Sequence, residues 1–164
     1  MKIDKMNWKK ERDRKAVMEI EQAAFPSEMR STEEDLAQYA SAKGSVGLVV
    51  RNELCDNSQG YALAVPLETV GYPGCKEDLD LGKHNSAYVE SLAVMPGERP
   101  VVLRRLLSRL EQELERTFSY AKMHVPVDEK LYHGLIAFGA KEVSRHDDFM
   151  RFGRTFAYLE VPLR

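Results

Sequence analysis

The sequence has few cysteines, no long apolar run and no large excess of charge of one sign. Two cysteines occur among 164 residues, Cys55 and Cys75, and their spacing fits neither a metal cluster nor a disulfide framework. No apolar run approaches the roughly 18 residues that span a bilayer, and the charged N-terminus lacks the apolar segment of a signal peptide. We therefore expect a cytoplasmic protein without a metal or a membrane segment, and with both thiols at its surface.

The formal charge of −2 gives no reason to expect a polyanionic partner. Residues 1–15 are locally basic, with seven Lys or Arg against three Asp or Glu, but Trp8 is their single aromatic residue. Single-stranded nucleic-acid binders usually combine basic and aromatic side chains. We therefore expect residues 1–10 to form a solvated basic leader, with a nucleic-acid arm as the disfavoured alternative. The length suits one domain, over residues 11–164.

Helices and strands alternate in the middle of the chain. Apolar spacing and capping signals predict helices over residues 12–25, from the capping-box pattern Ser31–Glu34, after Pro100, and from Asp128 to Gly139. Strand-forming runs predict strands over residues 46–51, 61–65, 87–94, 119–125, 140–145 and 149–161. A strand–helix–strand unit such as 87–125 pairs its strands in parallel, so we expect a mixed α/β sheet with helices on both faces.

Glu90 is the residue in these elements whose position most suggests chemistry. On an alternating strand it shares a face with Tyr88, Leu92 and Val94, so it is a lone carboxylate on an apolar stripe. Burial raises the pKa of such a group, which suits a base that removes a proton from an ammonium substrate. The alternative is a structural salt bridge to Lys122 or to another cation on the neighbouring strand.

Two further clusters have structural explanations that we favour. The run Asp78–Leu81 with His84 contains metal-ligand residue types, but the spacing matches no known site. An aromatic group near the C-terminus is expected to form core packing rather than a substrate platform: Phe149, Phe152, Phe156 and Tyr158.

Several fragments, taken in order, resemble the GCN5-related N-acetyltransferases. They are Ala24–Pro26 followed by Ser31–Leu36, Val89–Val94 followed by Pro96, and Leu131–Tyr132 followed by Phe138–Val143. The resemblance runs from about Glu11 to Val161. It implies an acyl-CoA N-acyltransferase-like fold, mixed and mostly antiparallel, with a central, splayed parallel strand pair. It also implies that acetyl-CoA donates an acetyl group to a small-molecule or protein amine by direct attack, and it leaves a homodimer open.

The same resemblance assigns roles to individual residues. It implies that Glu90 is the base and that Tyr132 is the acid that protonates the departing thiolate. The residues implied to bind the cofactor are Leu92, Ala93, Val94, Arg99, Val101, Val102, Leu103, Arg104, Arg105 and Asp128. The sequence departs from the family at Val102 and Arg104, where the pyrophosphate loop normally has small residues that let phosphates approach the backbone. The alternative function is therefore a non-catalytic binding module that has lost the cofactor.

Overall fold

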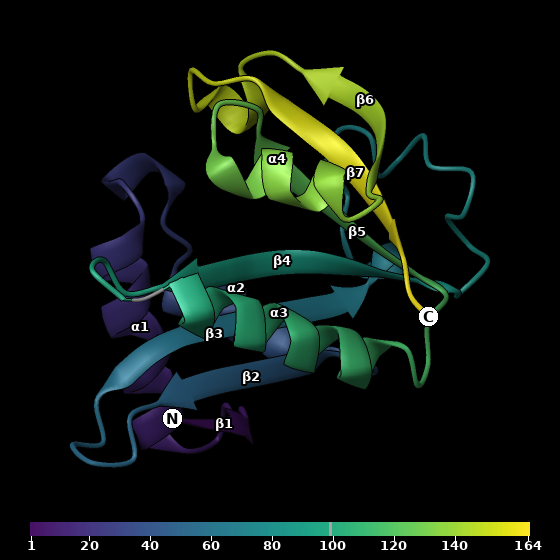
Figure 1. Cartoon of the computed structure of the whole chain (residues 1–164). Helices are drawn as coiled ribbons and strands as arrows, with labels where there is room; N and C mark the ends of the chain where they lie inside the picture. The colour runs from purple at the N-terminus through teal and green to yellow at the C-terminus, as the bar shows by residue number, and fades with distance from the viewer. Residues whose placement is uncertain (99) are drawn as a thin grey trace. The chain divides into compact units, whose positions relative to one another are not determined.

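The structure is a computed structural model that describes residues 1–98 and 100–164. In chain order the described residues form these elements: β1 (Lys2–Lys5), α1 (Glu11–Ala24), η1 (Ser27–Met29), α2 (Glu33–Ala40), β2 (Val46–Arg51), β3 (Ser58–Pro66), η2 (Leu67–Thr69), β4 (Ser86–Val94), α3 (Pro100–Leu114), β5 (Tyr120–Pro126), α4 (Lys130–Ala137), β6 (Lys141–His146), η3 (Phe149–Arg151) and β7 (Phe156–Pro162). Their succession can be followed by colour in Figure 1.

The described strands form one seven-stranded sheet in the order β1-β2-β3-β4-β5-β7-β6. The β1–β2, β2–β3, β5–β7 and β6–β7 pairs are antiparallel, whereas β4 and β5 run parallel. The parallel ladder has three residue pairs, from Ser86–Tyr120 to Tyr88–Lys122, although the two strands have nine and seven residues. The predicted fold class, with its central and splayed parallel pair, is confirmed.

The chain divides into two compact units. The first contains residues 1–65 and 89–113, and the second contains residues 66–88 and 114–164. In the first unit, α1 and α2 bury their apolar stripes against β2, β3 and β4 in one cluster: Ala16, Val17, Ile20, Leu36, Val49, Tyr61, Leu63 and Ala93. Burial of this surface is the main stabilising contribution to the unit.

The opposite face of the same strands is buried as well. On β2 and β3 the residues that alternate with that cluster are at most 1% exposed: Leu48, Val50, Ala62 and Ala64. The helix α3 buries Val102, Leu106 and Leu110 at helical spacing and lies in front of β2–β4 in Figure 1. Helices therefore cover both faces of these strands, as predicted.

In the second unit, β7 lies between β5 and β6 and pairs with β5 over seven residue pairs. Of the aromatic group expected to form core packing, Phe149, Phe156 and Tyr158 are buried, and the half-buried Phe152 lies against Phe149 and Phe156. However, the strand predicted over residues 149–161 begins only at Phe156, so residues 149–155 lie outside it. Positive φ angles at Asp148, Met150 and Arg151 bend the chain into a turn before β7 begins.

Two helix starts differ from the prediction. The capping box of α2 joins Thr32 to Asp35, one residue later than predicted, because the backbone N–H of Ser31 donates to Glu21. Asp128 does not cap α4: the N-cap residue is Glu129, and the Asp128 carboxylate lies 2.7 Å from Arg154 NH2.

The predictions of a solvated N-terminal leader and of an exposed Cys75 are both wrong. Lys2–Lys5, within the segment expected to be a solvated leader, pairs with β2, where Ile3 lies opposite Val50. Cys75 is fully buried rather than exposed, because its loop packs against β5 and β7 of the same unit, whereas Cys55 is exposed as expected.

Candidate active site

Burial alternates along the second half of β4. Ser91 and Ala93 are buried, whereas Glu90, Leu92 and Val94 are half-buried. The alternation follows from the pleat, which turns successive side chains to opposite faces. Glu90 therefore shares the more accessible face with Leu92 and Val94, as predicted, and its Oε2 atom is buried.

On the other face of β4, Ser91 belongs to a buried polar network that sequence reasoning missed. The Tyr61 hydroxyl donates to Oε1 of Glu21, and the Ser91 hydroxyl lies 2.5 Å from the Tyr61 oxygen. Ser91 also donates to Glu21 Oε1 at 3.2 Å. Burial, and then the negative charge of Glu21, raise the pKa of Tyr61, and the charge of Glu90 adds to the effect. Tyr61 therefore remains a hydrogen-bond donor.

The sequence did contain a signal for this network. Val17, Ile20 and Ala24 form the apolar stripe of α1, and Glu21 lies on that stripe with 1% of its surface exposed. A carboxylate at such a position must be hydrogen-bonded, because burying an unpaired charge is costly.

The first turns of α3 contain the residues expected to contact the cofactor's phosphates. Val102 is 3% exposed and faces the core of the first unit, whereas Arg104 and Arg105 are exposed. Neither arginine forms an ion pair with another described residue. The side chain of Val102 therefore does not cover the exposed surface of these turns, and two guanidinium groups are available to an anion. Arg99 lies outside the described residues.

Tyr132, the predicted acid, lies on α4 in the second unit. Its hydroxyl donates to Glu142 at 2.6 Å, and Arg145 donates to the Tyr132 oxygen at 3.3 Å. The hydrogen bond to Glu142 raises the pKa of Tyr132. Proton donation by Tyr132 to another group therefore requires that this bond be exchanged.

His124 on β5 is tightly held. Its Nε2 atom lies 2.8 Å from the carbonyl oxygen of Pro73, which can only accept, so Nε2 carries the hydrogen and Nδ1 accepts from the Tyr88 hydroxyl at 2.8 Å. The ring stacks on Phe149 and Tyr158. Burial lowers the pKa of His124 to about 3. With both nitrogens bonded and the ring neutral, His124 anchors the 66–86 loop and is a poor candidate for a base.

Lys122, two residues earlier on β5, also holds that loop. Its Nζ atom contacts Asp78, Asp80 and Glu160, and it is 1% exposed. The carboxylates that resembled metal ligands in the sequence therefore neutralise a buried lysine. The alternative role for Glu90, as the ion-pair partner of Lys122, is disfavoured because three other carboxylates already surround this ammonium group.

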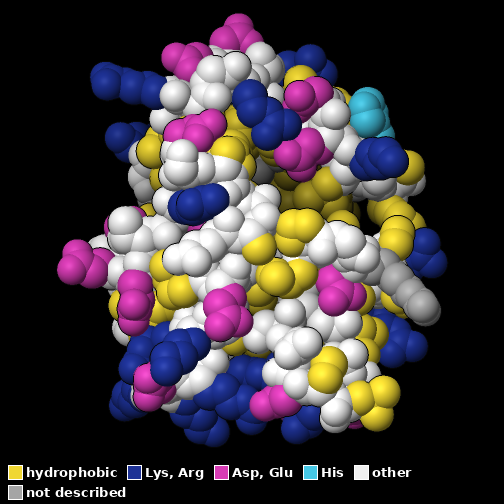
Figure 2. All heavy atoms as spheres, turned by 90° about the vertical axis from the view of Figure 1, so that its left-hand side faces the viewer, with side chains coloured by type: hydrophobic (Ala, Val, Ile, Leu, Met, Phe, Trp, Pro, Cys, Tyr) yellow, Lys and Arg dark blue, Asp and Glu magenta, His cyan; other side chains and the backbone are white. Residues whose placement is uncertain are grey.

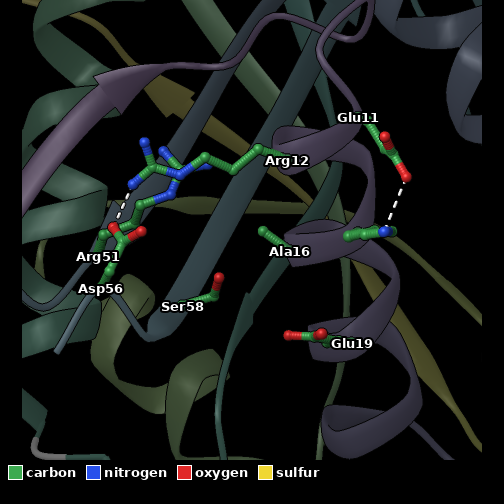
Figure 3. Close-up of a pocket in the computed structure, with 8 residues that line it drawn as sticks. Glu11, Arg12, Ala16, Glu19, Arg51, Asp56 and Ser58 are labelled. Atoms are coloured by element: carbon green, nitrogen blue, oxygen red, sulfur yellow. Dashed lines mark hydrogen bonds and ion pairs between the residues drawn. The ribbon is translucent and has the colours of Figure 1, made fainter.

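A pocket of about 380 Å³ lies beside the N-terminal half of α1 and is open to solvent (Figure 3). Its cations are all neutralised: Arg12 by Asp56, Lys15 by Glu11, and Arg51 by Asp13. This pairing makes the pocket a poor site for an anionic ligand.

Most cations of the basic N-terminal segment are similarly ion-paired, although no ion pair among the described residues involves Lys9 or Lys10. Figure 2 shows Lys and Arg side chains gathered at the lower edge of one face, with acidic side chains among them. Lys2 pairs with Asp4, and Lys5 pairs with the buried Glu113 of α3. Such pairing disfavours the nucleic-acid arm, which would need cations available to phosphates.

Neither a membrane span nor a metal cluster is found among the described residues. No described helix has the length and apolar content that crossing a bilayer requires. No group of three or more described His, Cys, Asp or Glu side chains is arranged to hold a metal ion.

Comparison with known proteins gives matches in structure alone. No protein-family model and no curated protein sequence matches the chain. Among solved structures, the Escherichia coli ribosomal-protein-S18-alanine N-acetyltransferase is similar over 99% of this chain and 93% of its own, with a TM-score of 0.73 and 18% identity. YncA of Salmonella typhimurium, a putative acetyltransferase solved with acetyl-CoA, is similar over 100% and 94%, with a TM-score of 0.72 and 17% identity.

A third similar structure is that of a putative acetyltransferase of the GNAT family from Desulfovibrio desulfuricans. It covers 99% of both chains with a TM-score of 0.71 and 14% identity. Agreement over nearly the whole of each chain, at identities this low, is agreement of fold. The chain therefore has the fold of the GCN5-related N-acetyltransferases.

Proposed function

We propose that this protein is an N-acetyltransferase that transfers an acetyl group from acetyl-CoA to a primary amine by direct attack. The observation that carries the proposal is Glu90, a carboxylate on the half-buried face of β4 in a fold that solved acetyltransferases share. A carboxylate in this environment suits a base that removes the proton of an ammonium group. The acceptor is a small-molecule amine or an amine of a protein.

On the donor side, the residues of β4 and α3 in the first unit suit an extended, anionic ligand. When bound, acetyl-CoA supplies a thioester whose acyl group is activated toward amines. We assign backbone contacts with the extended pantetheine arm of acetyl-CoA to Leu92, Ala93 and Val94. These residues of β4 lie beyond the three residue pairs that join β4 to β5. The N–H of Leu92 is our candidate donor to the acyl oxygen as negative charge develops there.

The phosphates are assigned to the first turns of α3, from Val101 to Arg105. Helix N-termini attract anions because their first N–H groups lack intrahelical partners, and Arg104 and Arg105 add two cations. Asp128, which the resemblance links to the arm, forms an ion pair with Arg154. We therefore expect Asp128 to contribute little to binding.

Tyr132 remains the proposed acid. Because its proton is shared with Glu142, we expect a smaller effect on turnover from Tyr132→Phe than from Glu90→Gln.

The alternative is a non-catalytic binding module. Two observations favour it. The Tyr132 hydroxyl already donates to Glu142, and positions 102 and 104 hold valine and arginine instead of small residues. Calorimetric titration with acetyl-CoA separates the two functions. Saturable micromolar binding supports the enzyme, and no heat up to millimolar acetyl-CoA supports the module.

Glu90→Gln tests the catalytic proposal directly. Turnover is expected to fall about 100-fold, a typical contribution of general-base catalysis, and to fall most at low pH, where more of the amine is protonated. The affinity for acetyl-CoA should stay close to that of the wild type. Glu111→Gln, on the exposed face of α3, is the matched control. Unchanged activity of Glu90→Gln across pH would remove Glu90 from its assigned role.

A further inference from the structure

Glu21 connects four elements of the first unit through one buried carboxylate. Its Oε2 atom accepts the backbone N–H of Ser31 at 2.8 Å, just before α2. Its Oε1 atom accepts from the hydroxyls of Tyr61 on β3 and Ser91 on β4. Glu21 itself lies on α1 and is 1% exposed, so these donors take the place of water.

The network joins the connection between α1 and α2 to the strand that contains Glu90. Ser31 follows the Phe25–Arg30 segment, which connects α1 to α2. Ser91 is the neighbour of Glu90 on β4. Because the pleat fixes the relation between adjacent residues, a bond that holds Ser91 also fixes the strand from which Glu90 projects.

The connecting segment is held in shape by its own contacts. Arg30 donates from Nε to the Phe25 carbonyl and from NH2 to the Gln22 carbonyl, both at 2.9 Å. These bonds tie the segment to the C-terminal end of α1. The link from Ser31 through Glu21 to Ser91 then connects it to β4.

We propose that Glu21 is a positioning residue that sets the placement of β4, and so of Glu90, relative to α1 and the segment before α2. This inference rests on the proposed acetyltransferase function. A carboxylate suits the role because it accepts only, and here all three of its partners donate. Glutamine has nearly the same shape but offers an NH2 group on one side. Either that group would face the Ser31 N–H, which cannot accept, or both hydroxyls would have to turn and accept from it.

Substitution of the network members, with steady-state kinetics, tests the inference. In Glu21→Gln, Tyr61→Phe and Ser91→Ala, kcat/KM for the amine is expected to fall roughly 10- to 100-fold, as expected for a misplacement of about 1 Å. The dissociation constant of acetyl-CoA should stay within about twofold, because α3 and the backbone of β4 beyond Ser91 are unchanged. Glu19→Gln, two residues away on α1 and exposed, is the matched control and should behave as the wild type.

Hydrogen exchange at the Ser31 amide provides a readout that does not require activity. Exchange should accelerate in Glu21→Gln and stay unchanged in Glu19→Gln. If Glu21→Gln does not fold, Tyr61→Phe and Ser91→Ala decide the matter by kinetics. An active wild type whose network variants keep their kcat/KM for the amine, or lose acetyl-CoA affinity in parallel, overturns the positioning role. A wild type that acetylates no amine overturns the proposed function instead.

Discussion

The neutral, half-buried ring of His124 predicts a specific loss of stability in mild acid. Its pKa is about 3 in the folded protein and close to 6.5 when unperturbed. Because the folded-state pKa is the lower one, the unfolded chain binds a proton first as the pH falls. The stabilisation by the neutral ring is therefore complete above pH 6.5 and is lost progressively between pH 6.5 and pH 3.

The magnitude follows from the two pKa values. A pKa difference of one corresponds to about 1.4 kcal/mol, so the full effect is about 5 kcal/mol, of which about 2 kcal/mol is lost between pH 8 and pH 5. For a domain of this size such a loss lowers Tm by about 4–8 °C. The carboxyl groups with a lowered pKa, such as Asp80, affect stability mainly below this range.

Urea unfolding at pH 8 and pH 5 measures the effect. In His124→Phe the ring still fits between Phe149 and Tyr158, but the titrating group is gone. The variant should be less stable at pH 8, because Tyr88 and Pro73 lose a hydrogen-bond partner. However, the decrease in its free energy of unfolding from pH 8 to pH 5 should be about 2 kcal/mol smaller than that of the wild type. His133→Gln, at an exposed position, should keep the wild-type dependence. Equal pH dependence in His124→Phe and the wild type would refute this account of the ring.

Two other variants test the charges. Lys122→Met leaves Asp78, Asp80 and Glu160 without their cation and should cost on the order of 3–5 kcal/mol at pH 7. In urea unfolding it should regain stability relative to the wild type as the pH falls below 4, since the lysine hydrogen bond lowers the pKa of Asp80; a constant difference would contradict this. The double variant Arg104→Ala/Arg105→Ala should weaken calorimetric binding of acetyl-CoA by about tenfold or more, whereas Lys43→Ala should not.

Periodic features could be predicted from the sequence because one local rule fixes each of them. The apolar spacing after Pro100 gives the helix α3, and alternation along β4 correctly assigns Glu90 to the face of Leu92 and Val94. These patterns need no knowledge of what lies opposite. The fold class followed from the order of such elements together with the family resemblance.

Features that depend on distant partners could not be predicted in the same way. The stripe of α1 contains Glu21, but its partners Tyr61 and Ser91 lie 40 and 70 residues farther along the chain. The one-residue shift of the α2 capping box has the same origin, because Glu21 holds the backbone N–H of Ser31. In both places a tertiary contact of Glu21 determines the local structure, and local sequence patterns do not reveal that contact.

The loop over residues 66–86 is another feature that depends on distant partners, which lie on β5. Lys122 and His124 lie two residues apart on β5, and both reach this loop, through Asp80 at 2.9 Å and through the Pro73 carbonyl at 2.8 Å. A loop of this length would ordinarily be a candidate for a lid. Here the loop covers the buried Lys122 and the half-buried His124, so opening it would expose an ion-paired lysine and a neutral histidine together. These polar residues of β5 thus serve to hold the loop. This leaves Glu90, on the more accessible face of β4, as the carboxylate that we propose for proton transfer.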